Sequence, residues 1–525
     1  MTESGTLNAG DNLSDHMATF LSITVKYKTN QAYQRKVWIY KEADFDKLNN
    51  LISHCDWNNL ITDAPNIDTA TENFSTQYLS FVRECVPEKS VTIRPRDKPW
   101  FDSTLRKNIR TLDRLRKKAL NSKKEIDWVN YHKHRNKVNN MKKYALSNYY
   151  DSIDFYISDA SINNNKLYWK LLKDVFRAKP TNDIPPLEYT SETGERIIAF
   201  SDSDKVDLLN SYFSSVSNVD DSSQQLPQID YTHHFSLSNV TIDEQDIKDI
   251  LSILPVNKAI GPDAISHKML KSTVHSVVKP LYFLFNRSLS ENIFPNSWKI
   301  AHVLPLFKKD TPCVVTNYRP VILLSCVSKV MERVIFKYLY NYFLKHDLFY
   351  KYQAGFLPGH STVYQSLETY HSIVQSIDEG KYCCMIFCDL SKAFDRVWHK
   401  GLIFKLQKYG VCGNLLHWFV NYLCDRKQKV MYKDMLSSCR SINAGVPQGS
   451  VLGPLLFLIY VNDVAENMIL LCRLFADDNS LQYTSYNVAN IEYILNHDLS
   501  VLDRWSSKWL LNFNPSKTKA VFFLH

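Results

Sequence analysis

The stretch LLCRLFADDNSLQYTSY, residues 470–486, decides the fold of this chain. An apolar run leads into two adjacent carboxylates, Asp477 and Asp478, and a second strand-like run follows them. This pattern predicts a β-hairpin with acids at its tip. Adjacent residues on a strand point to opposite faces, so both acids can reach one site only where the backbone turns, and we expect Asp477 to be the direct metal ligand. Taken alone, an Asp-Asp pair is also typical of a solvated turn.

A second apolar run, CCMIFCDLSKAFD at residues 383–395, delivers another carboxylate at a strand end. The pattern predicts a strand that ends at Asp389 and then turns into a helix. If Asp389 and Asp477 meet, their repulsion would raise a pKa unless a cation lay between them, which implies hard divalent ions such as Mg²⁺. Two such ions suit in-line displacement at phosphorus.

Between these acids lies GVPQGSVLGP, residues 445–454, followed by the helix-like run LLFLIYVND. Its glycines allow the backbone to approach a substrate closely. A lone Pro-Gln-Gly would be a weak signal. The three elements in this order, centred on residues 389, 448 and 477, are rarely obtained by chance.

These three elements resemble the A, B and C motifs of reverse transcriptases from non-LTR retrotransposons, jockey-like elements in particular. The resemblance is strongest over about residues 250–525, and its remaining stretches lie upstream and at the C-terminus: NKAIGPDAISHKMLK (257–271), WKIAHVLPLFKKD (298–310), NYRPVILLSCVSKVMERVI (317–335), YQAGFLPGHSTVYQSL (352–367) and LNFNPSKTKAVFF (511–523). It implies an α+β fold, a right-hand polymerase palm and fingers with an antiparallel palm sheet and packed helices, after a mainly helical N-terminal region. The implied activity is RNA-directed DNA polymerisation by nucleotidyl transfer of deoxynucleotides onto a DNA 3′ end.

The resemblance also assigns roles at the catalytic centre. Asp389 and Asp477 match the family's metal-binding aspartates, with Leu390 offering a backbone carbonyl and Asp478 a supporting carboxylate. Phe394 matches the steric gate that excludes a ribose 2′-hydroxyl, which implies deoxynucleotide substrates. The alternative for Phe394 is an ordinary apolar helix residue.

Four further positions match the family's nucleotide-binding residues. Gln448 resembles the glutamine beside the incoming nucleotide, and Gly449 lets the chain pass close to it. Lys308 and Arg319 resemble the finger residues that hold the triphosphate. Their chemistry suits this role, because ammonium and guanidinium groups pair with phosphate oxygens. Lys309 competes with Lys308 for this assignment.

The match is weaker at two places. Lys517 resembles the lysine proposed to protonate the departing pyrophosphate, and Lys519 is its competitor. The family usually has a basic residue where this chain has Leu357, so His360 alone remains of that template-contacting pair. We therefore expect one template or nucleotide contact to be lost.

A local basic block precedes the polymerase-like region. Residues 94–143 carry 17 Lys and Arg against 5 Asp and Glu, whereas the net charge of the whole chain is +9. Apolar residues at helical spacing predict two amphipathic helices with basic outer faces. Within the family frame these helices lie where relatives can grip nucleic acid, and the candidate contacts are Arg114, Arg116, Lys117 and Lys118. The alternative is a solvated helix face.

We expect three regions along the chain. Residues 1–23, in which we expect no strand or helix to be completed, resemble the end of an apurinic-type endonuclease through Ser14, Asp15 and His16. Residues 24–240 form a mainly helical, basic connecting region, with a linker rich in Ser, Asp and Gln at 217–228. Residues 241–525 form the fingers and palm, with a core at about 289–525 and no thumb.

The remaining expectations concern cofactors, partners and location. We expect two Mg²⁺ ions, with Mn²⁺ as a substitute, and as partners an RNA template, a DNA primer or target DNA, and deoxynucleoside triphosphates. The eleven cysteines show no zinc-ligand spacing, and no apolar run is long enough to cross a bilayer. The family implies an intracellular location, in cytoplasm and nucleus. Two other readings are a truncated, non-catalytic nucleic-acid-binding remnant and an RNA-dependent RNA polymerase, which Phe394 disfavours.

Overall fold

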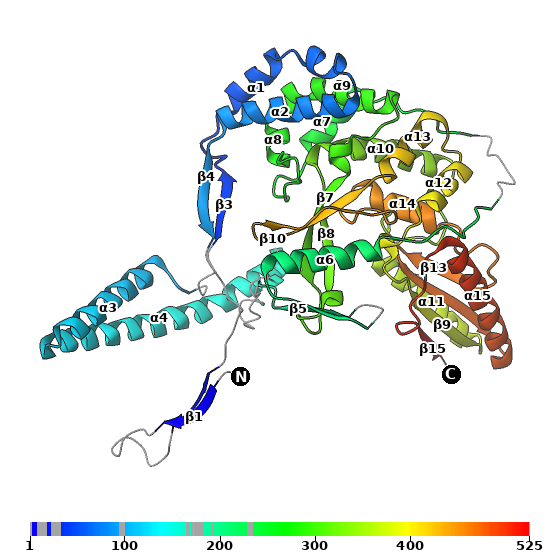
Figure 1. Ribbon diagram of the computed structural model, residues 1–525. Helices are drawn as coiled ribbons and strands as arrows, with labels where there is room; N and C mark the ends of the chain where they lie inside the picture. The colour runs from blue at the N-terminus through cyan, green and yellow to red at the C-terminus, as the bar shows by residue number, and fades with distance from the viewer. Residues whose placement is uncertain are drawn as a thin grey trace. The chain divides into compact units, whose positions relative to one another are not determined.

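The computed structural model describes residues 3–7, 18–22, 33–93, 100–163, 168–169, 172, 183–190, 194–227 and 235–523. The chain forms two compact units (Figure 1). The first comprises residues 1–35 and 92–184, and the second comprises residues 36–91 and 185–525. The expected boundary at residue 240 does not coincide with this division, and the three-region organisation stays a prediction.

The first unit contains a strand pair and a helical hairpin. Strands β1 (Glu3–Leu7) and β2 (Ala18–Ser22) pair antiparallel, so the expectation that residues 1–23 complete no strand is wrong. Helices α3 (Ser103–Ser122) and α4 (Glu125–Asn163) pack against each other, which confirms that two helices lie here; α3 is clearly amphipathic, whereas α4 shows little amphipathic character over its whole length. The triplet at residues 14–16 lies outside the described residues.

The helical hairpin is held by local capping and a thin apolar seam. The Asp102 side chain accepts a hydrogen bond from the Leu105 amide at 2.6 Å and caps the start of α3. Leu105 and Ala119 of α3 and Val138 of α4 are buried. An ion pair of 2.9 Å between Lys118 and Asp127 joins the two helices near their connection.

The second unit mixes helices and strands, as the predicted α+β class requires. Strands β3 (Tyr33–Trp38) and β4 (Glu88–Ile93) pair where the chain passes between the units. The helices of the second unit are α1 (Phe45–His54), η1 (Asn58–Thr62), α2 (Ile67–Cys85), α6 (Asp202–Val216), α7 (Glu244–Ser252), α8 (His267–Ser272), α9 (Val274–Ser290), η2 (Asn296–Lys299), η3 (Val315–Asn317), α10 (Cys326–Lys345), α11 (Thr362–Asp378), η4 (Ala393–Asp395), α12 (His399–Lys408), α13 (Gly413–Leu423), α14 (Leu452–Val461) and α15 (Val488–Trp509). Its remaining strands are β5 (Leu187–Thr190), β6 (Arg196–Ala199), β7 (Ile300–Phe307), β8 (Tyr318–Leu323), β9 (Tyr382–Asp389), β10 (Lys427–Tyr432), β11 (Met435–Leu436), β12 (Arg440–Ser441), β13 (Leu471–Phe475), β14 (Asp478–Ser485) and β15 (Lys519–Phe523).

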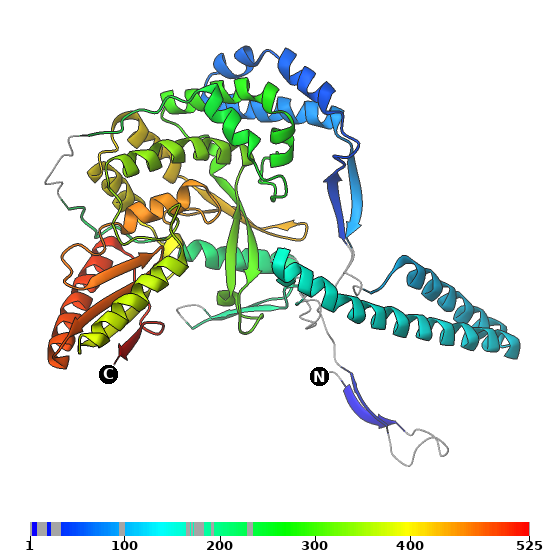
Figure 2. The same cartoon turned by 180° about the vertical axis from the view of Figure 1, so that it is seen from behind.

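One sheet of this unit, the mixed sheet, has the order β11-β10-β7-β8, with β12 paired to β10. Strands β7 and β8 form an antiparallel hairpin, whereas β7 and β10 run parallel. Helix α6 packs along β10, and the Asn210 amide donates to the carbonyl of Ser438 at 2.8 Å. Figure 2, in which the molecule is seen from behind, shows this helix crossing the strands.

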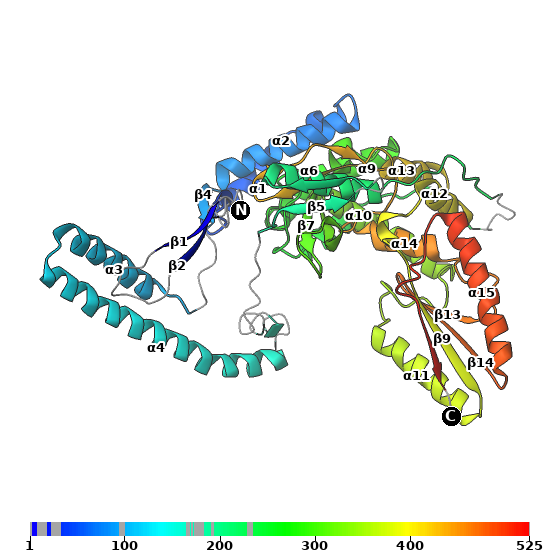
Figure 3. The same cartoon turned by 60° about the horizontal axis from the view of Figure 1, so that its bottom comes forward.

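The other sheet, the carboxylate sheet, has the order β13-β14-β9-β15 and is antiparallel throughout. Helix α11 packs against β9 and helix α15 against β14. Figure 3 shows the two helices on either side of the strands. The Gln482 amide donates to the Ser372 hydroxyl at 2.9 Å, so α11 lies on the face that carries Gln482. An antiparallel sheet with packed helices agrees with the predicted architecture.

A buried ion pair ties three helices together beneath the carboxylate sheet. Lys405 of α12 is fully buried, and its ammonium donates to Asp463 Oδ1 and to the Tyr460 carbonyl, both at 2.5 Å. The indole of Trp505 donates to the same Asp463 oxygen at 2.9 Å, and the ring centroid of Trp509 lies 3.9 Å from the ammonium. Burial lowers the pKa of Lys405 to about 8. The pair therefore joins α12 and the end of α14 to α15.

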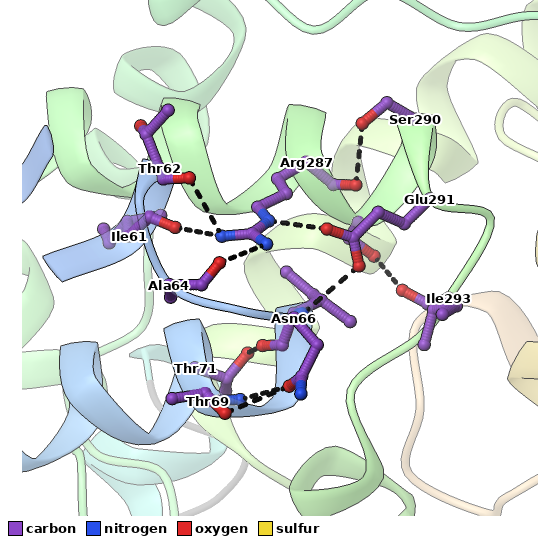
Figure 4. A network of polar contacts seen from close by, with 12 residues as sticks. Ile61, Thr62, Ala64, Asn66, Thr69, Thr71, Arg287, Ser290, Glu291 and Ile293 are labelled. Carbon is purple, nitrogen blue, oxygen red and sulfur yellow. Dashed lines mark hydrogen bonds and ion pairs between the residues drawn. The ribbon is translucent and has the colours of Figure 1, made fainter. Parts of the chain in front are cut away.

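The N-terminal helices of the second unit are docked on α9 through Arg287 (Figure 4). The Arg287 guanidinium donates to the carbonyls of Ile61 and Ala64 and to Glu291. Glu291 in turn accepts from the Ile67 amide at 3.2 Å, at the first residue of α2. Arg287 thus satisfies the carbonyls of Ile61 and Ala64, and Glu291, which it holds, satisfies the amide at the start of α2.

The predicted linker at residues 217–228 has no helix or strand over its described part, residues 217–227, but hydrogen bonds hold it to neighbouring segments. The Ser217 carbonyl accepts from the Ala444 amide at 3.0 Å. Asp221 accepts from the Trp398 indole at 2.6 Å, and the Gln224 amide donates to the Lys508 carbonyl at 2.6 Å. Polar composition suggested solvent exposure, but these side chains bond to neighbouring segments instead. Among the described residues, no helix has the length and apolar character needed to span a membrane.

Removing the charge of Asp463 should destabilise the second unit. Asp463→Ala leaves the buried Lys405 ammonium without its counter-ion, which should cost about 3–5 kcal/mol. Urea unfolding followed by tryptophan fluorescence measures this loss. The control Glu466→Ala removes an exposed partner, 3.2 Å from Lys408, and should change stability by less than about 1 kcal/mol. Equal effects of the two substitutions would contradict the role given to the buried pair.

Candidate active site

The three aspartates meet at one end of the carboxylate sheet. In the pairing of β14 with β9, Asp478 lies directly opposite Asp389. In the pairing of β13 with β14, Phe475 lies opposite Asp478, which leaves Ala476 and Asp477 as a two-residue turn. The predicted hairpin with acids at its tip is confirmed. Cross-strand partners project from the same face of a sheet, so Asp389 and Asp478 share a face and Asp477 projects from the turn.

The acidic turn is supported from behind by residues 353–355. The Gln353 side-chain oxygen accepts from the amides of Gly355 at 2.8 Å and Ala476 at 3.1 Å. A side chain at Gly355 would collide with the backbone of Ala476. Ala476 itself has φ +58°, a left-handed conformation that L-residues seldom adopt. The close packing of residues 353–355 holds this conformation and fixes the direction of Asp477.

The carboxylates interact electrostatically with one another and with one lysine. Partial burial and the nearby charges of Asp477 and Asp389 raise the pKa of Asp478, while Lys517 opposes that rise. The Lys517 ammonium lies 2.6 Å from Asp389 Oδ2. The backbone brings them together, because the Asn514 amide donates to the Asp389 carbonyl at 2.8 Å.

The two lysines considered for proton transfer occupy different places. Lys517 follows a turn and forms the ion pair with Asp389. Lys519 lies on β15, opposite Phe387. The geometry therefore favours Lys517 as the lysine nearest to the carboxylates.

Within the described part of the chain, no three His, Cys, Asp or Glu side chains are gathered as a ready-made metal cage. The three aspartates nevertheless lie within electrostatic range of one another. The Asp389 carboxylate is engaged by the Lys517 ammonium.

The turn after β9 carries Leu390 and Phe394. Leu390 is buried and bridges to Phe513. The ring of Phe394 is held between two aromatic rings, stacked on Phe457 with centroids 4.5 Å apart and edge-on to Phe356 at 5.8 Å. These two ring contacts restrict the orientation of the Phe394 side chain.

The 445–451 loop passes between this turn and strand β8. The Val446 amide donates to the Phe394 carbonyl at 2.8 Å, and the Ile322 amide donates to the Gln448 carbonyl at 3.2 Å. Gly449 has φ +127°, and a Cβ atom there would meet the Ile322 carbonyl oxygen at 2.5 Å. Only glycine fits this backbone.

The two basic residues predicted to hold phosphate lie on the β7–β8 hairpin. Arg319 is exposed on β8 opposite Leu306, and its charge reaches Asp395. Lys308 is exposed directly after β7, where its amide donates to the Asn317 carbonyl at 2.9 Å. The charge of Arg319 thus acts on the turn after β9, whereas Lys308 lies at the end of the β7–β8 hairpin.

The other predicted contacts are exposed side chains, namely His360 and four cations of α3. His360 is exposed in the turn before α11, and the neighbouring Leu357 is half-buried. The exposed side chains at the end of α3 that were predicted to contact nucleic acid belong to the first unit: Arg114, Arg116, Lys117 and Lys118.

Three residues escaped the sequence reasoning. Gln353 supports the acidic turn, and Asp395 accepts from the Gln448 amide at 2.7 Å. Glu332 accepts from the amides that begin α14, at 2.6 Å from the nitrogen of Val451. Glu332 is the one acidic residue of α10, and this isolated charge in an apolar helix is the sequence signal by which it could have been found. Burial raises the pKa of Glu332, and its position fixes the N-terminus of α14.

Residues 307–522 match the family model of reverse transcriptase, described as RNA-dependent DNA polymerase. The matched range contains the three aspartates, Lys517, Phe394, Gln448 and all of the carboxylate sheet except its last residue, Phe523.

Curated relatives are similar over a larger part of the chain. The probable RNA-directed DNA polymerase from transposon BS of Drosophila melanogaster is 30% identical over 424 residues, which cover 77% of this chain and 46% of that protein. The RNA-directed DNA polymerase from mobile element jockey of the same organism is 31% identical over 298 residues, covering 55% of this chain and 32% of the relative. The probable RNA-directed DNA polymerase from transposon X-element of Drosophila melanogaster is 32% identical over 273 residues, which cover 51% of this chain and 30% of that protein. This chain spans less than half the length of each of these relatives.

Gly449→Ala should displace the 445–451 loop, because the new Cβ collides with the Ile322 carbonyl in a backbone conformation that alanine avoids. Hydrogen exchange of the Ile322 amide should rise about tenfold or more as its bond to Gln448 weakens. Gly359→Ala is the matched control, since Gly359 also has a positive φ, of +83°, but no atom within 4 Å of an added Cβ. Unchanged exchange at Ile322 in Gly449→Ala would refute the close fit.

Proposed function

We propose that this chain is an RNA-directed DNA polymerase of a non-LTR retrotransposon, because residues 307–522 match the reverse transcriptase family model and the chain is similar to the polymerases of transposon BS and mobile element jockey. It would transfer deoxynucleotides onto a DNA 3′ end by copying an RNA template. Its partners would be that RNA, a DNA primer or target, and deoxynucleoside triphosphates. Its place of action would be inside the cell, in cytoplasm and nucleus as for the family.

The finer architecture follows from this proposal. The carboxylate sheet with α11 and α15 would be the palm, because it carries the acids on a rigid antiparallel frame. The mixed sheet with its exposed β7–β8 hairpin would be the fingers, since it presents Arg319 and Lys308. Residues 36–91, docked by Arg287, would extend the fingers at their N-terminal side.

The observation that carries the proposal is the register of β9 and β14, which sets Asp389 opposite Asp478 with Asp477 in the adjoining turn. Burial and the neighbouring charges of Asp477 and Asp389 raise the pKa of Asp478, and carboxylates that lie so close are suited to share a hard divalent cation. Asp389 and Asp477 would be the principal ligands, Asp478 a supporting carboxylate and Leu390 a carbonyl donor.

The donor set fits magnesium, because all of its atoms are oxygens and the charges are negative. When bound, magnesium would lower the pKa of the primer hydroxyl and stabilise the leaving phosphate oxygen. The Lys517 ammonium lies 2.6 Å from Asp389 and would thus be held at the end of the sheet where pyrophosphate departs. Lys517 would then supply its proton as a general acid.

The remaining residues would bind and select the nucleotide. Phe394, packed between two rings, would leave no room for a ribose 2′-hydroxyl. Gln448 and Gly449 would line the nucleotide site from the 445–451 loop. Arg319 and Lys308 would pair with triphosphate oxygens, and His360 would contact the template.

Primer extension tests the proposal directly. With Mg²⁺, an RNA template and a DNA primer, the purified chain should incorporate deoxynucleotides and discriminate strongly against ribonucleotides. Asp477→Ala should reduce incorporation at least about 10³-fold, because it removes a charge that acts on the transition state. Asp434→Ala, an exposed aspartate on the turn between β10 and β11, is the matched control and should keep activity within about twofold.

Incorporation that is absent, or equal in wild type and Asp477→Ala, would reject polymerase activity and favour the non-catalytic remnant. Efficient use of ribonucleotides would favour an RNA polymerase.

We propose, as a second part of the function, that the α3–α4 hairpin binds nucleic acid. Arg106, Arg110, Arg114 and Lys117 recur at helical spacing and are exposed on α3. Such a row of cations can follow a phosphate backbone without reading its sequence. A buried role is excluded for them by their exposure.

Replacing Arg114, Arg116, Lys117 and Lys118 by alanine should weaken nucleic-acid binding and lower its salt dependence. Each lost phosphate contact reduces the slope of log affinity against log salt by about 0.7–0.9, and because Arg114 and Lys117 belong to the exposed row, the slope should fall by about 1.4–1.8. Fluorescence anisotropy at several salt concentrations measures the slope. The control removes four exposed cations of the second unit, Arg83, Lys248, Lys279 and Lys345, and should leave the slope nearly unchanged. An unchanged slope in the α3 variant would show that these cations form a solvated helix face and do not bind nucleic acid.

A further inference from the structure

One carboxylate beside the proposed nucleotide site has no role so far. Asp395, the last residue of η4, accepts a hydrogen bond from the Gln448 side-chain nitrogen at 2.7 Å. The backbones around the two residues are fixed as well, because the Gly445 amide donates to the Val397 carbonyl at 2.8 Å. A Cβ atom at Gly445 would lie 2.7 Å from the Asp395 carbonyl. The turn that carries Asp395 and the 445–451 loop that carries Gln448 can therefore not slide past each other.

The chemistry of this bond determines which way the amide of Gln448 points. A glutamine amide has an oxygen that accepts and a nitrogen that donates, and free rotation would present either. An ionised carboxylate only accepts, so it selects the nitrogen and turns the oxygen away from itself. Burial raises the pKa of Asp395 to about 6, and the Gln448 hydrogen bond and the charges of Lys392 and Arg319 limit that rise. At neutral pH the carboxyl is therefore mainly ionised.

Asp395 also adjoins the other residue that would face the nucleotide. It directly follows Phe394 in the chain, and the Phe394 carbonyl accepts from the Val446 amide. The charge of Arg319 on β8 acts on the same carboxyl. One carboxylate thus lies among the side chains that come from three separate segments: the turn after β9, the 445–451 loop and strand β8.

We propose that Asp395 is a positioning residue that locks the Gln448 amide with its oxygen directed to the incoming nucleotide. The oxygen then accepts a hydrogen bond from a donor group of the nucleotide, and Asp395 itself touches no substrate. This inference rests on the proposed polymerase function. Asp395 would act on nucleotide affinity through Gln448, and the chemical step would be affected little.

Steady-state incorporation by three Asp395 variants tests the role. Asp395→Leu keeps the approximate shape but removes the acceptor, and should raise the KM for deoxynucleotide about tenfold with kcat within about threefold, as expected for a lost charge-assisted bond. Asp395→Asn keeps an acceptor but also donates, so the amide can adopt both orientations and KM should rise less. Asp263→Leu is the control, because Asp263 is another buried aspartate with a pKa raised by burial to about 6, bonded to Ser325 instead. It should lower the unfolding midpoint and leave KM within about twofold.

A double-mutant cycle separates positioning from a general structural effect. In a Gln448→Ala background, Asp395→Leu should change KM by less than about twofold, because there is no amide left to orient. A tenfold effect that persists in that background would overturn the proposal. So would a loss confined to kcat, or a KM that changes only in step with the unfolding midpoint.

Nucleotide binding and nucleotide incorporation, measured side by side, distinguish a failure of this inference from a failure of the proposed function. Binding of a fluorescent deoxynucleoside triphosphate is measured beside incorporation. A chain that binds nucleotide but does not incorporate it would reject the polymerase function alone, and the dissociation constants then replace KM in the cycle. A wild-type chain that does neither would overturn both.

Discussion

The register between β9 and β14 is the constraint on which the rest of this structure depends. It sets Asp478 against Asp389 and leaves Asp477 in a two-residue turn. A shift of one residue would turn every side chain of β14 to the other face of the sheet and separate the acids. Residues 353–355 and the Asn514 amide bond to the two strand ends, and they resist such a shift. The acids can thus lie close together although their charges repel.

Much of the remaining architecture holds short functional segments against that sheet. The 445–451 loop has no regular structure, and its position comes from backbone bonds to Phe394 and Ile322 and from Glu332 at the start of α14. The buried Lys405–Asp463 pair holds the helices beneath. Polar groups buried in this way require their partners, so the loop and the turn are fixed by hydrogen bonds as much as by apolar packing. Such preorganisation is what electrostatic catalysis requires.

The sequence predicted the parts of the fold in which pattern and chemistry coincide. Strand β9, the acidic hairpin, helix α14 and the α3–α4 hairpin were all expected, because apolar periodicity and the turn residues agree there. Pairings between distant segments were not predictable. Nothing in the composition of residues 217–227 indicated that Asp221 would bond to Trp398, and nothing around Gln448 indicated Asp395 as its partner. The sequence placed Asp389 and Asp477 at strand ends, as the structure has them, whereas the ion pair of Lys517 with Asp389 was not foreseen and the roles of all three residues stay proposals.

The central claim is that Asp389, Asp477 and Asp478 act as one metal centre. Asp389 and Asp477 are 88 residues apart in the chain. Cleavage by hydroxyl radicals generated at bound Fe²⁺ tests it most directly, since iron that replaces magnesium cuts only the backbone beside its own site. The account predicts cleavage near residues 389 and 477 together, suppressed by excess Mg²⁺ and lost at both places in Asp389→Ala. Cleavage at one of the two places alone, or cleavage that survives this substitution, would contradict it.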